Sequence, residues 1–147
     1  MTNLKMPLFN EDYTKRLGFI GECYVMLELA KRGTYSQKLY DVFDYDLIVN
    51  GGIRLEVKTS KIVIHKDKRR NTERKLWSFM NFNKKRRCDF YVFVCLDNNN
   101  LPEKFYVIPS FIINVVSNCI TIPREYKRKK RFERYENNWG ILHEMCN

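Results

Sequence analysis

Three carboxylates and one lysine surround a glycine turn in the segment DYDLIVNGGIRLEVKTSK, which spans residues 44–61. The carboxylates belong to Asp44, Asp46 and Glu56, and Lys58 follows two residues after the last of them. Carboxylate oxygens favour Mg²⁺ or Mn²⁺ over Zn²⁺, so a converging set of these acids would form a divalent-cation site. The Lys58 ammonium could then orient a water molecule or stabilise charge on a phosphate. Alternatively, Lys58 and Asp44 form a surface ion pair worth about 0–1 kcal/mol.

The acids converge only if the two strands that carry them pair in the right register. Residues 38–49 and 53–64 are predicted to form these strands, with residues 50–52 as the loop between them. Side chains alternate along a strand, so the second strand has one polar face and one apolar face, and we expect the apolar face to pack in the core. The polar face holds Arg54, Glu56, Lys58 and Ser60, and the other face holds Leu55, Val57 and Thr59.

The length of the loop decides whether Asp46 and Glu56 lie on the same face. A three-residue loop, Asn50-Gly51-Gly52, pairs Val49 with Ile53 and places Asp46 across from Glu56. A two-residue loop would instead put the two carboxylates on opposite sides of the sheet. The longer loop keeps the apolar residues of both strands together, and glycine supplies the positive φ that it needs. Two facing carboxylates repel each other, and a proton or a bound cation removes the repulsion.

The segment before these strands, residues 11–32, has the composition of a long helix. It contains no proline, begins with two acids and ends at Gly33, a residue type that commonly terminates helices. Glu22 falls on an arc of this helix that is otherwise apolar, where a carboxylate is costly unless it is paired or bound to a cation. The alternative is that the helix turns Glu22 toward its edge.

The chain is strongly basic, with 147 residues, a net charge of +10 and a pI near 9.5. Much of this charge lies in the runs 65–75, 84–87 and 124–134. Three such runs beside a hairpin of acids favour a nucleic-acid partner over a merely solvated surface. Residues 65–75 are predicted to be a basic loop that holds backbone phosphates. The expected nucleic-acid contacts are Lys61, Lys66, Arg69 and Arg70, together with Arg54 and Ser60 on the acidic face.

The rest of the chain alternates short apolar runs with turns, which predicts an α/β or α+β sheet covered by the long first helix. Further strands are expected at 75–82, 89–96, 104–109 and 119–123, and a helix at 110–117. The aromatic residues Trp77, Phe79 and Phe82 are expected in the core rather than on a base-stacking surface. We expect one domain over residues 1–147, with its core at about 11–123 and a basic, aromatic C-terminal segment at 124–147.

Other classes of protein fit the sequence poorly. No apolar run reaches the roughly 18 residues of a membrane span, and the first residues contain no apolar signal core. The five cysteines are odd in number and form no CxxC or Cys/His pair, so neither a disulfide framework nor a zinc site is suggested. We therefore expect a cytoplasmic protein with reduced thiols, without a membrane partner or a small-molecule substrate.

The candidate residues also match a known pattern. Tyr45-Asp46 and Glu56-Val57-Lys58, with Glu22 in the preceding helix GFIGECYVMLELAKRG, resemble the PD-(D/E)xK nuclease superfamily. The later segment CDFYVFVCLD…KFYVIPSFI strengthens the likeness to the branch of Holliday junction resolvases and intron-associated endonucleases. The resemblance covers roughly residues 15–115, and Tyr45 stands where the name of the superfamily has proline.

The resemblance implies a restriction-endonuclease-like fold, in which a four-stranded mixed sheet is flanked by helices. It implies Mg²⁺-dependent (or Mn²⁺-dependent) hydrolysis of DNA phosphodiester bonds. Asp46, Glu56 and the Val57 carbonyl would bind the metal, and Lys58 would position or activate the attacking water. Glu22 would hold a second metal or a metal-bound water, so the catalytic set implied is Glu22, Asp46, Glu56 and Lys58.

Several functions remain compatible with the sequence. As a nuclease, the protein could cut branched junctions or a specific duplex site, and cutting both strands would call for a homodimer. An RNA endonuclease is a weaker option. The alternative from another class is a non-catalytic nucleic-acid-binding module on a nuclease-like fold, which would bind with a steep salt dependence and without a metal.

Overall fold

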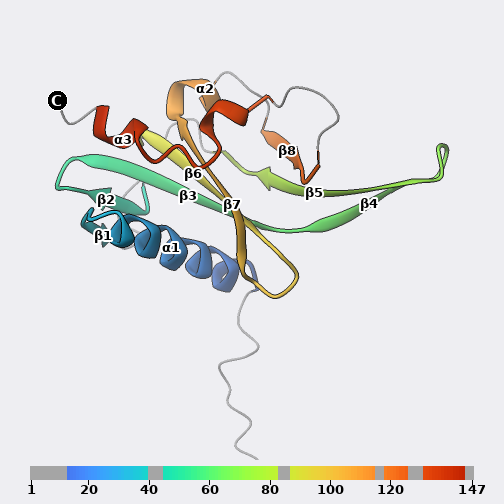
Figure 1. Ribbon diagram of the computed structural model, residues 1–147, viewed down its shortest axis with the longest axis horizontal. Helices are drawn as coiled ribbons and strands as arrows, with labels where there is room; N and C mark the ends of the chain where they lie inside the picture. The colour runs from blue at the N-terminus through green and yellow to red at the C-terminus, as the bar shows by residue number, and fades with distance from the viewer. Residues whose placement is uncertain (1–12, 40–44, 83–86, 115–117, 126–130, 145–147) are drawn as a thin grey trace, which may run out of the picture.

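The computed structural model describes residues 13–39, 45–82, 87–114, 118–125 and 131–144. It has a mixed α/β fold with a mixed central sheet and a long first helix, as expected from the sequence (Figure 1). In chain order the elements are α1 (Tyr13–Lys31), β1 (Ser36–Lys38), β2 (Leu47–Val49), β3 (Ile53–Lys61), β4 (Val63–Asp67), β5 (Thr72–Met80), β6 (Phe90–Leu96), β7 (Pro102–Pro109), α2 (Ser110–Asn114), β8 (Cys119–Pro123), the 3-10 turn η2 (Glu133–Tyr135) and α3 (Ile141–Glu144).

The central sheet has five strands in the order β1-β2-β3-β6-β7, one more than the resemblance implied. β3 and β6 are parallel, and every other neighbouring pair is antiparallel. All residues of β6 are buried, which confirms that the apolar run at 89–96 is a central strand covered on both faces. The remaining strands β4, β5 and β8 form a second, three-stranded sheet.

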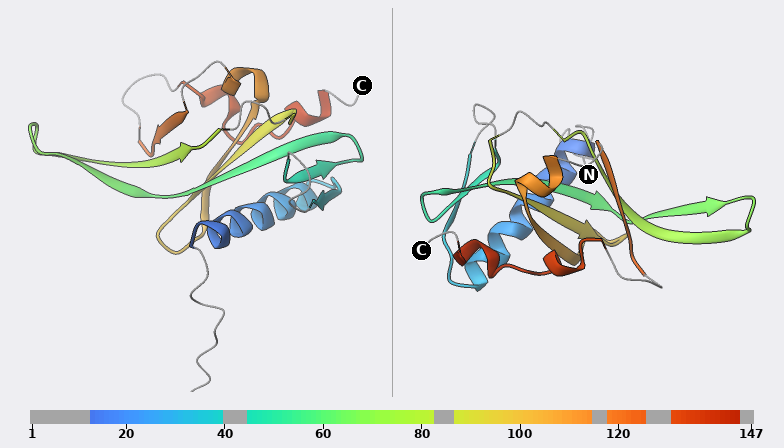
Figure 2. Two further views of the ribbon diagram at one scale, coloured as in Figure 1. Left: turned by 180° about the vertical axis from the view of Figure 1, so that it is seen from behind. Right: turned by 90° about the horizontal axis from the view of Figure 1, so that it is seen from above.

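The central sheet separates two hydrophobic clusters, and Figure 2 shows the elements that cover each face. α1 covers one face, where Val25 and Leu29 pack against alternate residues of β2, β3 and β6. The second sheet, α2 and η2 cover the other face, where Trp77 and Phe79 of β5 pack against Phe93 of β6. β3 is part of the central sheet, so its successive side chains point alternately toward α1 and toward the opposite face.

The helix and the later strands agree with the sequence analysis. α1 falls within the expected 11–32, and β6, β7 and β8 occupy the segments expected to be strands. α2 ends at Asn114, and the remainder of the expected helix at 110–117 lies outside the described residues. In the C-terminal segment, Trp139 and Leu142 are buried against the cluster beneath α1. Among the described helices, none combines the length and the hydropathy that a membrane span requires.

Residues 38–49 do not form the single strand that the sequence suggested. β1 ends at Lys38 and β2 begins at Leu47, and the two strands pair antiparallel, with Lys38 opposite Leu47. Residues 40–44, which include Asp44, lie outside the described residues. The chain therefore folds back at this point, and β1 supplies the hydrogen-bonding partner that β2 would lack as an edge strand.

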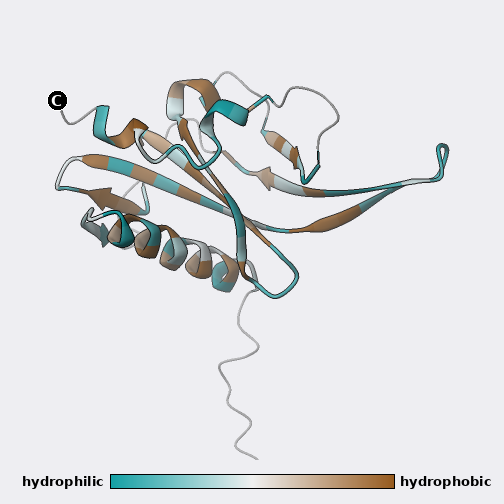
Figure 3. Ribbon diagram, viewed as in Figure 1, coloured by the Kyte–Doolittle hydropathy of each residue, from teal (hydrophilic) through white to brown (hydrophobic). Residues whose placement is uncertain are grey.

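The basic segment 65–75 is a β-hairpin rather than the expected loop. β4 follows β3 after Ile62 alone and pairs antiparallel with β5, from Val63 opposite Leu76 to Asp67 opposite Thr72. The prediction was wrong because the outer part of the hairpin is solvent-exposed on both faces, so its strands show no alternation of apolar and polar residues. Figure 3 shows the far end of the hairpin as hydrophilic, beyond a hydrophobic stretch of β4 that holds the exposed Val63 and Ile64.

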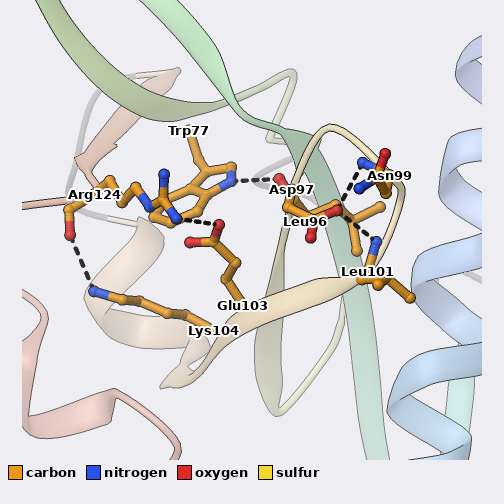
Figure 4. Close-up of polar contacts among 8 residues, drawn as sticks. All are labelled: Trp77, Leu96, Asp97, Asn99, Leu101, Glu103, Lys104 and Arg124. Carbon is orange, nitrogen blue, oxygen red and sulfur yellow. Dashed lines mark hydrogen bonds and ion pairs between the residues drawn. The ribbon is translucent and has the colours of Figure 1, made fainter.

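Trp77 is fully buried, which confirms its assignment to the core rather than to a base-stacking surface. Its Nε1 donates a 2.8 Å hydrogen bond to the Leu96 carbonyl, and Figure 4 shows this bond beside the turn that joins β6 to β7. In that turn the Asp97 carboxylate accepts hydrogen bonds from the backbone N–H groups of Asn99 and Leu101, at 2.7 and 3.0 Å. β5 is thus tied to the end of β6. Phe79 and Phe82 are buried as well.

Candidate active site

The β2–β3 hairpin has the register that the apolar pattern predicted. Val49 lies opposite Ile53, and Leu47 lies opposite Leu55, so the connecting loop has three residues. Asn50 and Gly51 both adopt positive φ, at 48° and 72°. The left-handed backbone at this turn is therefore supplied by Asn50 as well as by the expected glycine.

Asp46 lies directly before β2 and is fixed against the backbone of β3. Its backbone N–H donates a 2.9 Å hydrogen bond to the Leu55 carbonyl. Because Leu55 is already the partner of Leu47, this bond is shifted by one residue from the regular β2–β3 register. Its carboxylate Oδ2 accepts a 2.8 Å hydrogen bond from the backbone N–H of Val57. The side chain thus takes the place that a backbone carbonyl holds in a regular ladder. Asp46 is half-buried, and its hydrogen-bonding partner Val57 directly follows Glu56 in β3.

Glu56 is only 1% exposed, although its side chain is a carboxylic acid. Its Oε1 lies 3.5 Å from Nζ of Lys58, the next residue on the same face of β3. Lys58 also donates a 3.2 Å hydrogen bond to the Asn81 carbonyl, and its ammonium lies 5.9 Å from the centre of the Phe82 ring. The acid and the lysine are thus held together on one strand, as their spacing predicted, and the lysine offsets part of the cost of burying the acid.

Two further residues that the sequence did not single out lie near Glu56. Tyr91 of β6 is its partner across the parallel β3–β6 pair. Cys88 precedes β6, and burial, with the negative charge of Glu56, raises the pKa of its thiol to about 11. The thiol is therefore protonated at neutral pH. These neighbours come from a segment more than thirty residues further along the chain, so spacing within the hairpin could not reveal them.

Glu22 is carried by α1, which packs closely on β3 through Gly21 and Thr59. Its Oε2 forms a 2.7 Å ion pair with Nζ of Lys38 at the end of β1. Burial acts to lower the pKa of Lys38, but the bond to Glu22 and the charges of Glu22 and Asp46 outweigh it and raise that pKa. Lys38 is therefore held chiefly by Glu22, and the charge of Asp46 contributes least to its pKa. The sequence did not indicate this pair.

The acids Glu22, Asp46 and Glu56 do not form one compact cluster. Within the described ranges, no three His, Cys, Asp or Glu side chains lie close enough together to hold a metal ion. The structure brings Asp46 and Glu56 to neighbouring positions on the β2–β3 hairpin, whereas Glu22 is engaged by Lys38. The oxygen donors of the hairpin have the chemistry that Mg²⁺ or Mn²⁺ prefers.

Two of the expected DNA contacts are engaged within the protein. Arg54 forms a bidentate pair with Asp89, with hydrogen bonds of 3.1 and 2.9 Å from its guanidinium and 2.8 Å from its backbone N–H. Burial acts to raise the pKa of Asp89, but these bonds hold it below its ordinary value. Ser60 is buried, and its Oγ accepts a 3.0 Å hydrogen bond from the Ser78 N–H. Ser60 therefore joins β3 to β5 rather than reaching the surface.

The other expected contacts lie along β3 and the β4–β5 hairpin. Lys61 is half-buried at the end of β3. Lys66, Arg69 and Arg70 are exposed on the hairpin, where Lys66 also lies 3.5 Å from Glu73 across the strands. All three are placed where a long polyanion could reach them.

A comparison with solved structures finds a protein of the same fold. The chain matches a bacterial homing endonuclease, I-Ssp6803I, with a TM-score of 0.67 and 22% sequence identity, over 90% of this chain and 92% of that one. No protein-family model matches the chain, and a search of curated proteins finds no match. The likeness at this identity establishes the fold, and it extends over almost the whole length of both chains.

Proposed function

We propose that this protein is a metal-dependent endonuclease that hydrolyses phosphodiester bonds in DNA. The observation that carries the proposal is the buried Glu56 carboxylate with the Lys58 ammonium 3.5 Å away, beside the Asp46 carboxylate fixed on the Val57 N–H. Buried ionisable groups beside a charge partner are costly and are concentrated at functional sites. The fold shared with a homing endonuclease supports the same function.

Asp46, Glu56 and the Val57 carbonyl would hold the divalent cation. The N–H and C=O of one strand residue point to the same side, so the Val57 carbonyl faces the edge where its N–H meets Asp46. Two carboxylates and a carbonyl provide oxygen donors only, which suits Mg²⁺ or Mn²⁺. When bound, such a cation lowers the pKa of a coordinated water and neutralises charge on the scissile phosphate.

Lys58 would orient the attacking water and stabilise charge on the phosphate. Its ammonium is held between the Asn81 carbonyl and Glu56 Oε1, so it would need little reorganisation during the reaction. Glu22 would position a water of the metal site or hold a second cation. That cation would have to share Glu22 with Lys38 or displace it, because the two side chains now form an ion pair.

Among possible substrates, we favour a specific site in duplex DNA over a branched junction. The structural neighbour is a homing endonuclease, and the basic β4–β5 hairpin extends outward from the strand that carries Glu56 and Lys58 (Figure 1). The described part of the chain carries one candidate site. Cutting both strands therefore calls for two copies, and we propose a homodimer on the DNA.

The proposal is tested with linear duplexes from a random-sequence pool, whose cut ends are sequenced, and with four-way junction, flap and single-stranded DNA, each in Mg²⁺, Mn²⁺ or EDTA. Asp46→Asn is a useful variant, because its amide oxygen can still accept the Val57 hydrogen bond while the charge is lost. Lys58→Met removes the ammonium and keeps the length of the side chain. We expect each to lower the cleavage rate by about 100-fold or more, with DNA affinity changed little.

A non-catalytic binding module is the competing function. In that case the protein would bind DNA with a steep salt dependence, and none of the substrates would be cut with either cation. Cleavage that persists in EDTA would reject the metal-dependent mechanism while leaving a nuclease.

A further inference from the structure

β4 and β5 form a two-stranded ribbon that projects from the body of the protein (Figures 1 and 2). The ribbon spans residues 63–76, and its four-residue tip, 68–71, joins Asp67 to Thr72. Residues 63–66 and 72–75 are all exposed, so in the outer ribbon neither face is packed against another element. An isolated hairpin of this kind contributes little to stability, which points to a role in contacting a partner.

The charge of the ribbon indicates the chemistry of that partner. It carries six lysines and arginines against two acids, a net charge of +4 within fourteen residues. The basic side chains are Lys66, Lys68, Arg69, Arg70, Arg74 and Lys75, and His65 lies among them. A polyanion is the matching partner.

The shape of the ribbon selects duplex DNA among polyanions. The major groove of B-form DNA is about 12 Å wide and admits a two-stranded β-ribbon. Each strand of the ribbon has five residues and is therefore about 17 Å long, which exceeds the groove depth of about 8.5 Å. The major groove of A-form RNA is too deep and narrow for side chains to read.

Hydrogen bonds within the chain order the tip without a partner. The Asp67 carboxylate Oδ1 accepts hydrogen bonds from the backbone N–H groups of Arg69 and Arg70, at 2.9 and 3.4 Å. Asn71 closes the turn with a φ of 48°. A preformed tip lowers the entropic cost of docking, and arginine can donate two parallel hydrogen bonds to guanine in the major groove.

We propose that the β4–β5 ribbon enters the major groove and reads the base sequence, with Arg69 and Arg70 as the main base-contacting residues. The proposal rests on the DNA-cleaving function proposed above and assigns its sequence specificity to this ribbon. β3 continues into β4 after one residue, so Asp67 lies nine positions after Lys58 along an extended chain, about 30 Å at 3.3 Å per position. At 3.4 Å per base pair, the bases that are read lie about six to ten base pairs from the cleaved bond.

The test is a binding selection from a pool of random-sequence duplex DNA, carried out in EDTA so that metal-dependent cutting cannot occur. Three proteins are compared: the wild type, the double variant Arg69→Lys/Arg70→Lys, and the control Arg16→Lys, which alters an exposed arginine on α1. Lysine keeps the charge but cannot form the two parallel hydrogen bonds of arginine. Affinity for a duplex of unselected sequence is measured in parallel.

We expect the wild type and Arg16→Lys to select one motif and the double variant to lose preference at specific positions by about tenfold or more per base pair. The double variant should bind the unselected duplex within about twofold of the wild type, since phosphate contacts depend on charge. An unchanged motif in the double variant overturns the proposal, as does a wild type that selects no motif.

The position of the cut provides an independent readout. On the selected site with Mg²⁺, we expect the cleaved bond about six to ten base pairs from the positions that depend on the two arginines. A cleaved bond within about three base pairs of the arginine-dependent positions overturns the assigned geometry. If the motif depends on the arginines but no DNA is cut under any condition, the nuclease function fails and sequence reading by the ribbon stands.

Discussion

The close packing of α1 on β3 can be tested with a single methyl group at Gly21. A Cβ at this buried position would lie 1.7 Å from Thr59 Oγ1 and 2.9 Å from Thr59 Cβ. Rotating the Thr59 side chain removes the first contact but leaves the second, so Gly21→Ala forces the helix and the strand apart. Overpacking of this kind costs about 1–3 kcal/mol.

Gly18→Ala is the matched control, because a Cβ at Gly18 meets no atom within 4 Å. Both substitutions add about the same favourable helix propensity, roughly 1 kcal/mol, so the difference between them isolates the steric contact. We expect the free energy of unfolding of Gly21→Ala to lie about 1–3 kcal/mol below that of Gly18→Ala. Urea denaturation followed by far-ultraviolet circular dichroism measures it.

A difference below about 0.5 kcal/mol between the two variants would refute the close approach of α1 to β3. Adding Thr59→Ala to Gly21→Ala removes Oγ1 and Cγ2 and should restore part of the lost stability. Because Glu22 follows Gly21 directly, the same displacement should weaken the Glu22–Lys38 ion pair.

The remaining predictions concern contacts around the sheet. Trp77→Phe removes the hydrogen bond to the Leu96 carbonyl and should lower the free energy of unfolding by about 1–3 kcal/mol in urea denaturation, and an unchanged value would contradict the bond. Burial opposes but does not cancel the effect of Arg54, so the pKa of Asp89 lies below its ordinary 3.8. A carboxylate with a lowered pKa contributes its full stabilisation above the ordinary pKa, and this contribution is lost as the pH falls through the lowered pKa of the folded state. The stability difference between wild type and Asp89→Asn should therefore be larger at about pH 6 than at about pH 2.5, and equal differences would contradict this.

The register of the β2–β3 hairpin was predictable because it is fixed by burial. Leu47, Val49, Leu55 and Val57 must lie on one face to be buried together, and a single loop length achieves this. The neighbouring positions of Glu56 and Lys58 follow from the same alternation. Strand period and apolar consistency are local properties, so one sequence is enough to reveal them.

The parts that the sequence did not reveal depend on contacts between distant segments or on exposed strands. The Arg54–Asp89 and Glu22–Lys38 pairs join different elements, and no spacing rule predicts them. The hydrogen bond that the Val57 N–H donates to the Asp46 carboxylate replaces a regular ladder contact, which strand parity does not describe. The β4–β5 hairpin is exposed on both faces in its outer part, so its charged residues resembled a loop.

The central claim is that the Glu56 carboxylate takes part in metal-dependent cleavage of DNA. The most direct measurement is the rate at which a supercoiled plasmid that carries the selected motif is nicked or linearised in Mg²⁺, for the wild type, Glu56→Gln and the control Glu144→Gln, an exposed acid on α3. We predict that the wild type and the control cleave the DNA and that EDTA abolishes this cleavage. The rate for Glu56→Gln should be lower by about 100-fold or more, with DNA binding retained. Equal cleavage by Glu56→Gln and the wild type would contradict the account.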